Sequence, residues 1–378
     1  MYVQIAKDRN EWNSIVDRNP HSVLHHRYEV CVHEDNALPL IIKEENHRFL
    51  FPLKIVKLLG SFRLAVSPIY YHASLLADTN AFALMPKALG HVTDFLRGIQ
   101  VNYLCSSAPT FLSKQYAYLL DQWFRKQNAS VQIIYAHMIH TENVAFEDIW
   151  RHRVRKRTRE EIRKARREGV NVVRIDTVDD IREWMKDIHQ CNISALKRQG
   201  RWGAYPDSYK EVFLSELISS KELLKEHFNI YGAVYRGHLI AYMIFQEYNG
   251  FMALSKAASH TKFLVKHPND VLIAYVLKEA CEKKVHWLEY TFDRVRYGGK
   301  IPSLHSGIRA FKRKFGFEDV PIPIYRLGLT RSGRTIQRLY TGREYIITRG
   351  AYIPKFVRSF FLRFYAPRRR RLSVYLHV

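Results

Sequence analysis

The stretch Trp150–Val170, WRHRVRKRTREEIRKARREGV, decides how the rest of the chain is interpreted. On a helix, its apolar and small residues recur at spacings of four and three, so they share one stripe. Almost all other positions are cationic, against three glutamates, and their mutual repulsion is uncompensated. The stretch predicts one continuous helix that ends at Gly169 and leads into a strand over 170–175. The stripe facing the protein body is Trp150, Val154, Thr158, Ile162 and Ala165.

A strongly basic helix has two interpretations. It is either a solvated face held by salt bridges, which is the common case for charge runs, or a surface that lies beside an anionic partner. The chain has 378 residues and a formal net charge of +24, which favours a phosphate-rich partner such as nucleic acid, anionic lipid, a nucleotide-linked substrate or an acyl-carrier pyrophosphate. Because 47% of the residues are hydrophobic, we expect about two domains with packed cores.

The four cysteines argue against a disulfide framework and against a zinc site. Cys31, Cys105, Cys191 and Cys281 are widely spaced, with no C-x-x-C pair. The first residues have no apolar segment typical of a secretory leader, and no window reaches the roughly eighteen apolar residues of a membrane span. We therefore expect a cytoplasmic protein without a bound metal.

Hydrophobic periodicity divides the chain into two similar halves. Up to residue 136 it predicts strands, helix, strand, helix, strand. After residue 181, two helices precede strands over 228–235, 239–248 and 251–259, and Asn249-Gly250 between the last two is a strong hairpin signal. A helix over 271–284 and a strand over 285–291 follow. This order predicts an α/β (α+β) fold, with mixed sheets flanked by helices, as in an acyltransferase core.

A second motif follows this strand: Gly307-Ile-Arg-Ala-Phe-Lys-Arg-Lys-Phe-Gly-Phe317. Together with the R-x-x-I-R-K-A-x-x-x-G-V pattern that begins at Arg159, it resembles the FemAB-like branch of the GNAT acyltransferase superfamily, which has two GNAT-like domains in tandem. The resemblance covers about residues 10 to 325. It implies an N-terminal GNAT-like domain over 1–145, a C-terminal catalytic domain over 146–325 and a basic aromatic tail over 326–378.

The resemblance implies direct attack of an amine on an activated acyl or aminoacyl ester, with no metal and no covalent enzyme intermediate. Lys312 matches the motif lysine and is the candidate for stabilising an oxyanion or phosphate, with Phe311 packing to fix it. Glu289 matches an acidic strand position of the family and is the candidate general base. The alternatives are a surface lysine for Lys312, and for Glu289 a salt bridge to Arg294 or Arg309.

Further residues are candidates for substrate binding. Arg159, Arg163 and Lys164 match the family's basic helix, where the implied role is to dock an anionic donor or acceptor. Tyr290 is placed to offer a phenol near the leaving group, with simple packing as the alternative. Arg309 belongs to the same motif as Lys312 and is included in the substrate-binding set.

The identity of the donor stays open. Acetyl-CoA-dependent GNAT enzymes have a glycine-rich loop whose backbone N–H groups hold the pyrophosphate. The corresponding segment, 255–270, contains no glycine, although the helix N-terminus at Asn269 and Asp270 suits a phosphate. Some FemAB-like enzymes use aminoacyl-tRNA, and a net charge of +24 suits that polyanion. We expect acyl-CoA or aminoacyl-tRNA as donor and an amine acceptor, lipid- or nucleotide-linked, on a cell-envelope precursor or glycan.

The tail is the most basic and aromatic part of the chain. A helix over 354–365 would place five apolar residues on one arc, and four consecutive arginines follow at 368–371. This composition is typical of a helix lying in an anionic interface, at the inner face of the membrane; docking on the protein body is the alternative. Two further functions stay open: a nucleic-acid-binding protein on a non-catalytic GNAT scaffold, and a membrane-surface protein that acts only through this tail.

Vesicle flotation tests the tail. We expect the full chain to float with vesicles rich in phosphatidylglycerol, and removal of residues 350–378 to abolish most of that recovery, because basic residues near an anionic surface each contribute about 1 kcal/mol. Phosphatidylcholine vesicles are the control. Equal recovery of the two proteins would end the membrane hypothesis.

Overall fold

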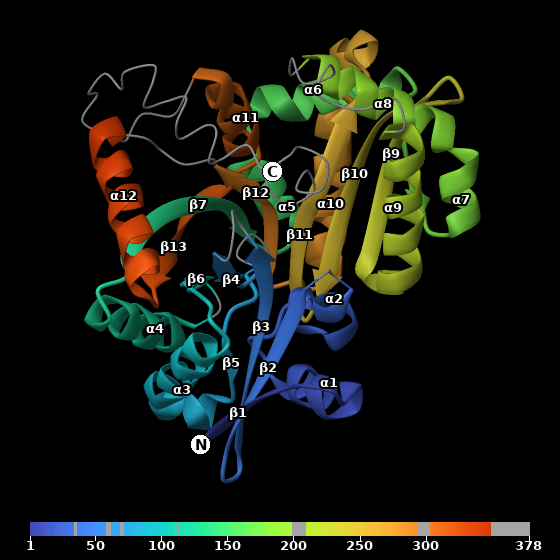
Figure 1. Ribbon diagram of the computed structural model, residues 1–378. Helices are drawn as coiled ribbons and strands as arrows, with labels where there is room; N and C mark the ends of the chain where they lie inside the picture. The colour runs from blue at the N-terminus through green and yellow to red at the C-terminus, as the bar shows by residue number, and fades with distance from the viewer. Residues whose placement is uncertain are drawn as a thin grey trace. The chain divides into compact units, whose positions relative to one another are not determined.

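The computed structural model describes residues 1–33, 36–57, 62–68, 72–109, 111, 113–198, 209–293 and 303–348 (Figure 1). Its internal contacts divide the chain into two compact units. Unit 1 contains Met1–Ala136, Phe292–Gly307 and Val320–Val378, and unit 2 contains His137–Thr291 and Ile308–Asp319. Each unit is made of several segments of the chain, and the chain returns to unit 1 at Val320. The continuous domains predicted with boundaries at 145 and 325 stay a prediction.

Unit 1 is built on a mixed sheet with strand order β1-β2-β3-β4-β6-β13-β7, and β5 pairs with β3. The strands are β1 (Tyr2–Ile5), β2 (Ala37–Glu44), β3 (His47–Lys57), β4 (Arg63–Val66), β5 (Leu76–Ala77), β6 (Tyr103–Ser107), β7 (Ser130–His140) and β13 (Glu318–Gly328). The helices are α1 (Arg9–Arg18), α2 (Tyr28–Val32), α3 (Met85–Gly98), α4 (Lys114–Lys126) and α12 (Arg331–Thr348), with 3₁₀ turns at Leu24–His26 and Thr79–Leu84.

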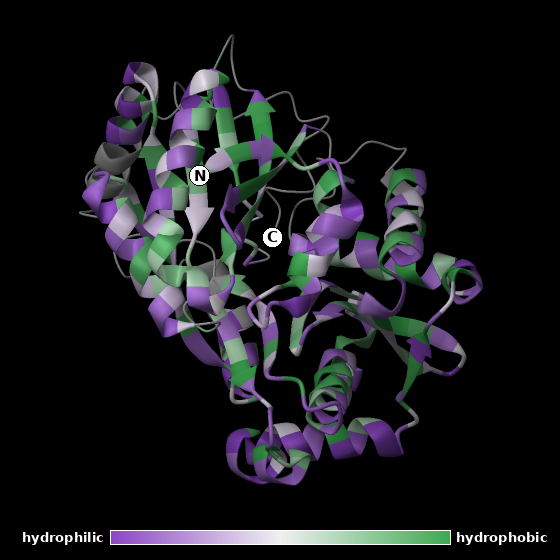
Figure 2. Cartoon of the chain, turned by 90° about the horizontal axis from the view of Figure 1, so that it is seen from below, coloured by the Kyte–Doolittle hydropathy of each residue, from purple (hydrophilic) through white to green (hydrophobic). Residues whose placement is uncertain are grey.

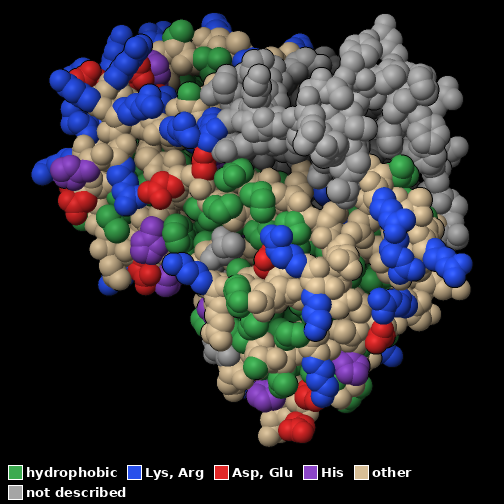
Figure 3. Space-filling view, turned by 90° about the vertical axis from the view of Figure 1, so that its left-hand side faces the viewer, with side chains coloured by type: hydrophobic (Ala, Val, Ile, Leu, Met, Phe, Trp, Pro, Cys, Tyr) green, Lys and Arg blue, Asp and Glu red, His purple; other side chains and the backbone are tan. Residues whose placement is uncertain are grey.

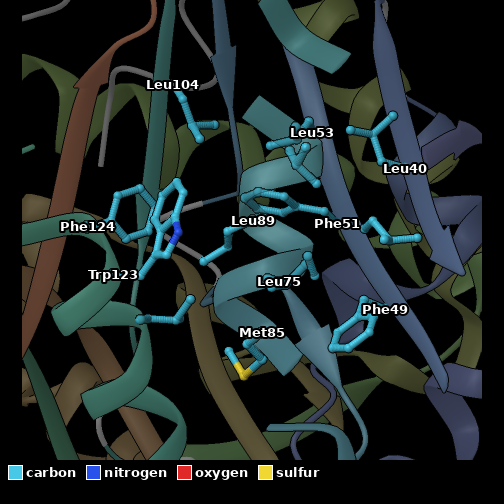
Figure 4. Close-up of a cluster of buried hydrophobic side chains, with 14 of the residues drawn as sticks. Leu40, Phe49, Phe51, Leu53, Leu75, Met85, Leu89, Leu104, Trp123 and Phe124 are labelled. Atoms are coloured by element: carbon cyan, nitrogen blue, oxygen red, sulfur yellow. The ribbon is translucent and has the colours of Figure 1, made fainter. Parts of the chain in front are cut away.

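The core of unit 1 lies between this sheet and helices α3 and α4. Figure 4 shows Phe49, Phe51 and Leu89 directed into it. Phe124 of α4 stacks on Tyr325 of β13, with ring centroids 4.5 Å apart. Alternation along β2 and β3 explains the packing, because every second side chain of a strand points to the same face.

The beginning of the predicted tail is part of folded unit 1. Leu327 and Leu329 belong to the buried core, and the side chain of Gln337 on α12 accepts from the backbone of Gly328 and donates to the carbonyl of Asn128. The predicted helix over 354–365 and the arginines at 368–371 lie outside the described residues.

In unit 2 the strands follow the order β12-β11-β10-β9-β8. The strands are β8 (Asn171–Ile175), β9 (Phe228–Tyr235), β10 (His238–Tyr248), β11 (Phe251–Ser259) and β12 (Trp287–Asp293). Strands β8 to β11 are antiparallel neighbours, whereas β12 is parallel to β11. The helices are α5 (Phe146–Asp148), α6 (Lys156–Arg167), α7 (Val178–Glu183), α8 (Met185–Arg198), α9 (Tyr209–Leu224), α10 (Pro268–Glu282) and α11 (Ser303–Arg313), with a π-turn at Ile149–Arg153 and 3₁₀ turns at Lys225–His227 and Thr261–Lys266.

Strands β9, β10 and β11 form the hairpin-linked meander that the turn sequences predicted. Both residues of each turn have positive φ: 51° and 77° at Arg236 and Gly237, and 48° and 72° at Asn249 and Gly250. This is the conformation that two-residue hairpin loops require. The predicted mixed α/β architecture is confirmed, and Figure 2 shows hydrophobic residues gathered along the strands and hydrophilic residues on the outer turns of the helices.

The prediction of one continuous basic helix was wrong, although its buried stripe was right. A π-turn ends at Arg153, Val154 is extended, and α6 begins only at Lys156. The break forms because the backbone N–H of Arg155 donates to the carbonyl of Lys314, 2.9 Å away, instead of continuing the helix. Val154, Thr158, Ile162 and Ala165 are all at most 3% exposed, so burial of the stripe survives the break.

The basic face of α6 is exposed. Arg157, Arg163, Lys164, Arg166 and Arg167 are exposed side chains. On the face drawn in Figure 3, Lys and Arg side chains are far more widespread than Asp and Glu. None of the helices in the described part of the chain is long and apolar enough to cross a membrane.

Two glycines that follow helices test how unit 2 is held together. Gly169 after α6 and Gly316 after α11 both have positive φ, but a Cβ on Gly316 would lie 2.6 Å from the Cβ of Arg153, whereas one on Gly169 meets nothing within 4 Å. We expect Gly169→Ala to cost about 1 kcal/mol of unfolding free energy and Gly316→Ala about 1–3 kcal/mol more, from overpacking. Urea denaturation measures both, and equal losses would contradict this account of the contact.

Candidate functional site

The site is built where β11 and β12 separate. Their parallel ladder pairs Phe251 with Trp287, Met252 with Leu288 and Ala253 with Glu289, and ends there although both strands continue. In sheets with parallel strands, ligands bind beyond the carboxyl ends of strands that part in this way. The side chains that follow Glu289 on β12 are therefore the first place to look for chemistry.

Lys312, on α11, has its amino group buried at this point. The side chain is 1% exposed, and Nζ donates to Oγ1 of Thr291, 3.1 Å away. Nζ also lies 5.6 Å from the ring centroid of Tyr290. A buried amino group is costly unless it is hydrogen-bonded, so its position is specified rather than incidental. The surface-lysine alternative for Lys312 does not hold.

Thr291 itself is in an unusual backbone conformation. Its φ is 52°, in the left-handed region, which a β-branched residue rarely adopts. Such strain costs of the order of 1–3 kcal/mol and is kept only where the surroundings enforce it, commonly at functional sites. Thr291 was not predicted from the sequence, because nothing in the residue type indicates this conformation.

Glu289 is the second predicted catalytic residue. It is 2% exposed and lies on β12, two residues before Thr291. Its neighbours Leu288 and Tyr290 both belong to the core cluster of unit 2, so strand alternation directs Glu289 to the opposite face of the sheet. The structure thus places a buried carboxyl group on β12 two residues before Thr291, which accepts a hydrogen bond from the buried amino group of Lys312; the catalytic roles of Glu289 and Lys312 remain a prediction.

Aromatic rings hold α11 against β12. The ring of Tyr290 lies 5.7 Å from Phe311 and 5.8 Å from Phe317, and Phe311 lies 5.5 Å from Phe315. Burial, with a smaller contribution from the charge of Asp270, raises the pKa of Tyr290 well above its usual value. The phenol is therefore protonated at neutral pH and is able to donate a hydrogen bond but not to act as a base.

Asn269 and Asp270 occupy the N-terminus of α10, as predicted, but they are engaged by protein groups. The carboxylate of Asp270 is 2.7 Å and 2.8 Å from Nζ of Lys314 through its two oxygens. The side-chain amide of Asn269 donates to Oγ of Ser259, 3.2 Å away. Asp270 also forms, with Glu161 and His267, a group of ligand atoms within 4.8 Å of one another; Lys314 already pairs with Asp270, and Arg157 with Glu161.

Arg309 lies on α11 and its guanidinium contacts Asp319 at the start of β13. Arg313 approaches the same carboxylate at 3.3 Å, and Nδ1 of His137 lies 3.0 Å from its other oxygen. Asp319 was missed from the sequence, because only the fold shows that it faces both arginines. The contacts of Asp319 with Arg309 and Arg313 hold α11 in place, and Lys312 with it. The predicted contact of Arg309 with a substrate stays untested.

The predicted docking residues on α6 differ from one another. Arg159 donates through Nη1 to the carbonyls of Trp150 at 2.7 Å and Val154 at 3.1 Å. It therefore closes the end of the π-turn and serves to position α6. Arg163 is exposed, and Lys164 is exposed with Glu168 3.8 Å from its amino group. Of the three, Arg163 and Lys164 are the ones placed to meet an external anion.

Comparisons with known proteins fit this geometry. Residues 152–298 match the family model for the acetyltransferase (GNAT) domain. No curated protein matches the chain.

Among solved structures, FemX has a TM-score of 0.56 at 12% identity, covering 90% of this chain and 99% of that one. The C-terminal domain of a putative lysylphosphatidylglycerol synthetase from Agrobacterium fabrum has a TM-score of 0.54 at 12% identity, covering 91% and 98%. L-PGS from Bacillus licheniformis has a TM-score of 0.54 at 12% identity, covering 90% and 97%. At these identities the similarity concerns the fold.

Replacement of Asp319 by Asn tests the anchor of α11. Burial alone would raise the pKa of Asp319, but the hydrogen bond from Arg309 and the nearby positive charges lower it below its usual value. A lowered pKa stabilises the fold above the ordinary Asp value of about 4, and that stabilisation is lost as the pH falls through the folded-state value. We expect Asp319→Asn to cost about 1–3 kcal/mol at pH 7 and progressively less towards pH 3, measured by urea denaturation. Glu318→Gln, which alters the exposed neighbour, is the control; a pH-independent loss for Asp319→Asn would refute the electrostatic account.

Proposed function

We propose that this protein is an N-acyltransferase, because residues 152–298 match the family model of the acetyltransferase (GNAT) domain. It transfers an acyl or aminoacyl group to an amine on a cell-envelope precursor or glycan. The observation that supports the proposal best is the buried amino group of Lys312 on Thr291, at the point where β11 and β12 separate. Unit 2 carries the chemistry.

The proposed step uses the two buried polar side chains of this site. The acceptor nitrogen attacks the carbonyl carbon of the donor, and the N–C bond forms as the C–O or C–S bond to the donor breaks. Lys312 donates a hydrogen bond to the oxyanion of the tetrahedral intermediate, which matters most in a site with little water. Glu289 takes the proton that the nitrogen loses on attack and passes it to the leaving group.

The donor is acyl-CoA or aminoacyl-tRNA. A glycine-rich phosphate loop is absent from 255–270, and the α10 terminus carries Asp270, whose carboxylate repels phosphate unless Lys314 compensates it. The exposed cations of α6 give a polyanionic donor a place to dock. The proposed place of the reaction is the cytoplasm, next to the inner face of the membrane.

Replacement of Lys312 by Met tests the function. We expect kcat to fall by about 10²–10³-fold, the usual cost of losing one oxyanion donor, with KM for the donor nearly unchanged. Transfer of label is followed from ¹⁴C-acetyl-CoA and, separately, from tRNA charged with ¹⁴C-amino acids, to a nucleotide-linked peptide precursor that carries a free amine. Far-UV circular dichroism and thermal unfolding check that the variant folds.

The matched control is Lys278→Met, because Lys278 lies exposed on α10 beside Glu282. Full activity of Lys312→Met would remove Lys312 from the mechanism. If the wild-type protein transferred label from neither donor but bound RNA in a salt-dependent manner, the alternative of a nucleic-acid-binding protein on a non-catalytic scaffold would replace the proposal.

A further inference from the structure

A β-bulge interrupts the pairing of β10 and β11 just past the point where β11 leaves β12. Ile244 pairs with Lys256 and the next residue, Phe245, pairs with Leu254, so Ser255 is an extra residue on β11. Bulges are common next to active sites, where they redirect a side chain. Here the redirected side chain is that of Lys256.

Lys256 and Glu289 lie on the same face of the sheet. Phe245 and Leu254 belong to the core cluster that also contains α10 residues. Ile244, next to Phe245, therefore points to the other face, and its partner Lys256 points with it. Glu289 is directed to that face by the same alternation and pairs with Ala253, three residues before Lys256.

Helix α9 covers this face around Lys256. The amino group lies 3.7 Å from the ring centroid of Phe213. Among the described residues, none forms a hydrogen bond or ion pair with it. Burial lowers the pKa of Lys256 to about 8, against a smaller opposing effect of Glu216 on α9; burial also raises the pKa of Glu216.

One more charge approaches β11, from α8. Arg198 donates to the carbonyl and to Oγ of Ser259, both at 3.3 Å. Of the neighbouring charges, Glu216 from α9 is the one that opposes the effect of burial on the pKa of Lys256, while the partner of Lys256 on β10, Ile244, is apolar.

The proposed reaction requires two proton transfers. An aliphatic amine arrives as R–NH₃⁺, since its pKa is about 10, and must lose one proton before it can attack and a second after attack. The carboxylate of Glu289 can hold only one of these two protons. If Glu289 takes the second proton, another group must accept the first. Desolvation lowers the pKa of Lys256, so a part of this lysine is neutral near neutral pH and is able to accept the first proton.

We propose that Lys256 accepts the first proton, from the ammonium form of the acceptor, and that Glu289 accepts the second. This rests on the proposed function. Lys256 becomes –NH₃⁺ as R–NH₃⁺ becomes R–NH₂; after transfer, Lys256 returns its proton to water, and the leaving group takes the proton held by Glu289. The face of the sheet under α9 is thus the amine side of the reaction.

Chemical labelling tests the lysine without any substrate. The full chain is treated briefly with trinitrobenzenesulfonate across pH 6–11, a range chosen around the ordinary lysine value of about 10.4, and the modified peptides are quantified by mass spectrometry. We expect Lys256 to reach half-maximal labelling near pH 8, well below the ordinary lysine value of about 10.4. Labelling of Lys256 at the same pH as Lys278, or no labelling at all, would overturn the proposal, because a proton acceptor must be reachable and titrate low.

Kinetics test the role. With the donor saturating, wild-type kcat/KM for the amine should rise with pH and level off above about pH 8. Lys256→Met should lose that rise and about 10²-fold in activity, whereas Lys278→Met keeps both. Glu216→Gln should move the rise to lower pH, because the negative charge of Glu216 favours the protonated lysine.

An unchanged pH profile for both Lys256→Met and Glu216→Gln would refute the role of Lys256 as proton acceptor. Labelling as expected in a protein that transfers nothing would instead refute the function while leaving the reactive lysine.

Discussion

Burial of the Lys312 amino group is the constraint on which the arrangement of unit 2 depends. At 1% exposure it has lost almost all contact with solvent, and Oγ1 of Thr291 is one acceptor that replaces water. A buried donor that loses its partner costs about 1–3 kcal/mol, so α11 and β12 must keep a fixed register. The strained backbone at Thr291 is consistent with this, because the strain persists only where neighbours enforce it.

Helix α11 is fixed by residues that flank Lys312. Arg309 and Arg313 share the carboxylate of Asp319. Lys314, just after the helix, is paired with Asp270, and its carbonyl accepts the N–H of Arg155. The same contact with Arg155 breaks the basic stretch into a π-turn and α6. The two motifs that stood out in the sequence are therefore joined through a backbone hydrogen bond.

Local signals in the sequence were sufficient for the meander and insufficient for the site. Strands β9 and β11 have the predicted bounds, since Arg-Gly and Asn-Gly turns leave the chain little choice of register. The stripe of α6 was also visible as a pattern. By contrast, the break before Lys156, the left-handed Thr291 and the bulge that redirects Lys256 all come from contacts between segments distant in sequence. No window of residues contains that information.

The distribution of charge around α10 bears on how the proposed anionic donor would approach. Where a phosphate binds at a helix N-terminus, the free backbone N–H groups point at the anion, but here Asp270 occupies that terminus, is 3% exposed and is paired with Lys314. The attraction must therefore come from side chains beside the helix rather than from its dipole alone. Lys266, just before α10, is bound to Glu168 at the end of α6 with 2.8 Å between Nζ and Oε2, so the exposed cations at the end of α6 lie next to this terminus. A donor with phosphates spread along its length could contact both the α10 terminus and the cations of α6. It would therefore bind this surface more tightly than a donor with a single compact pyrophosphate. Its affinity would also fall more steeply as salt is added.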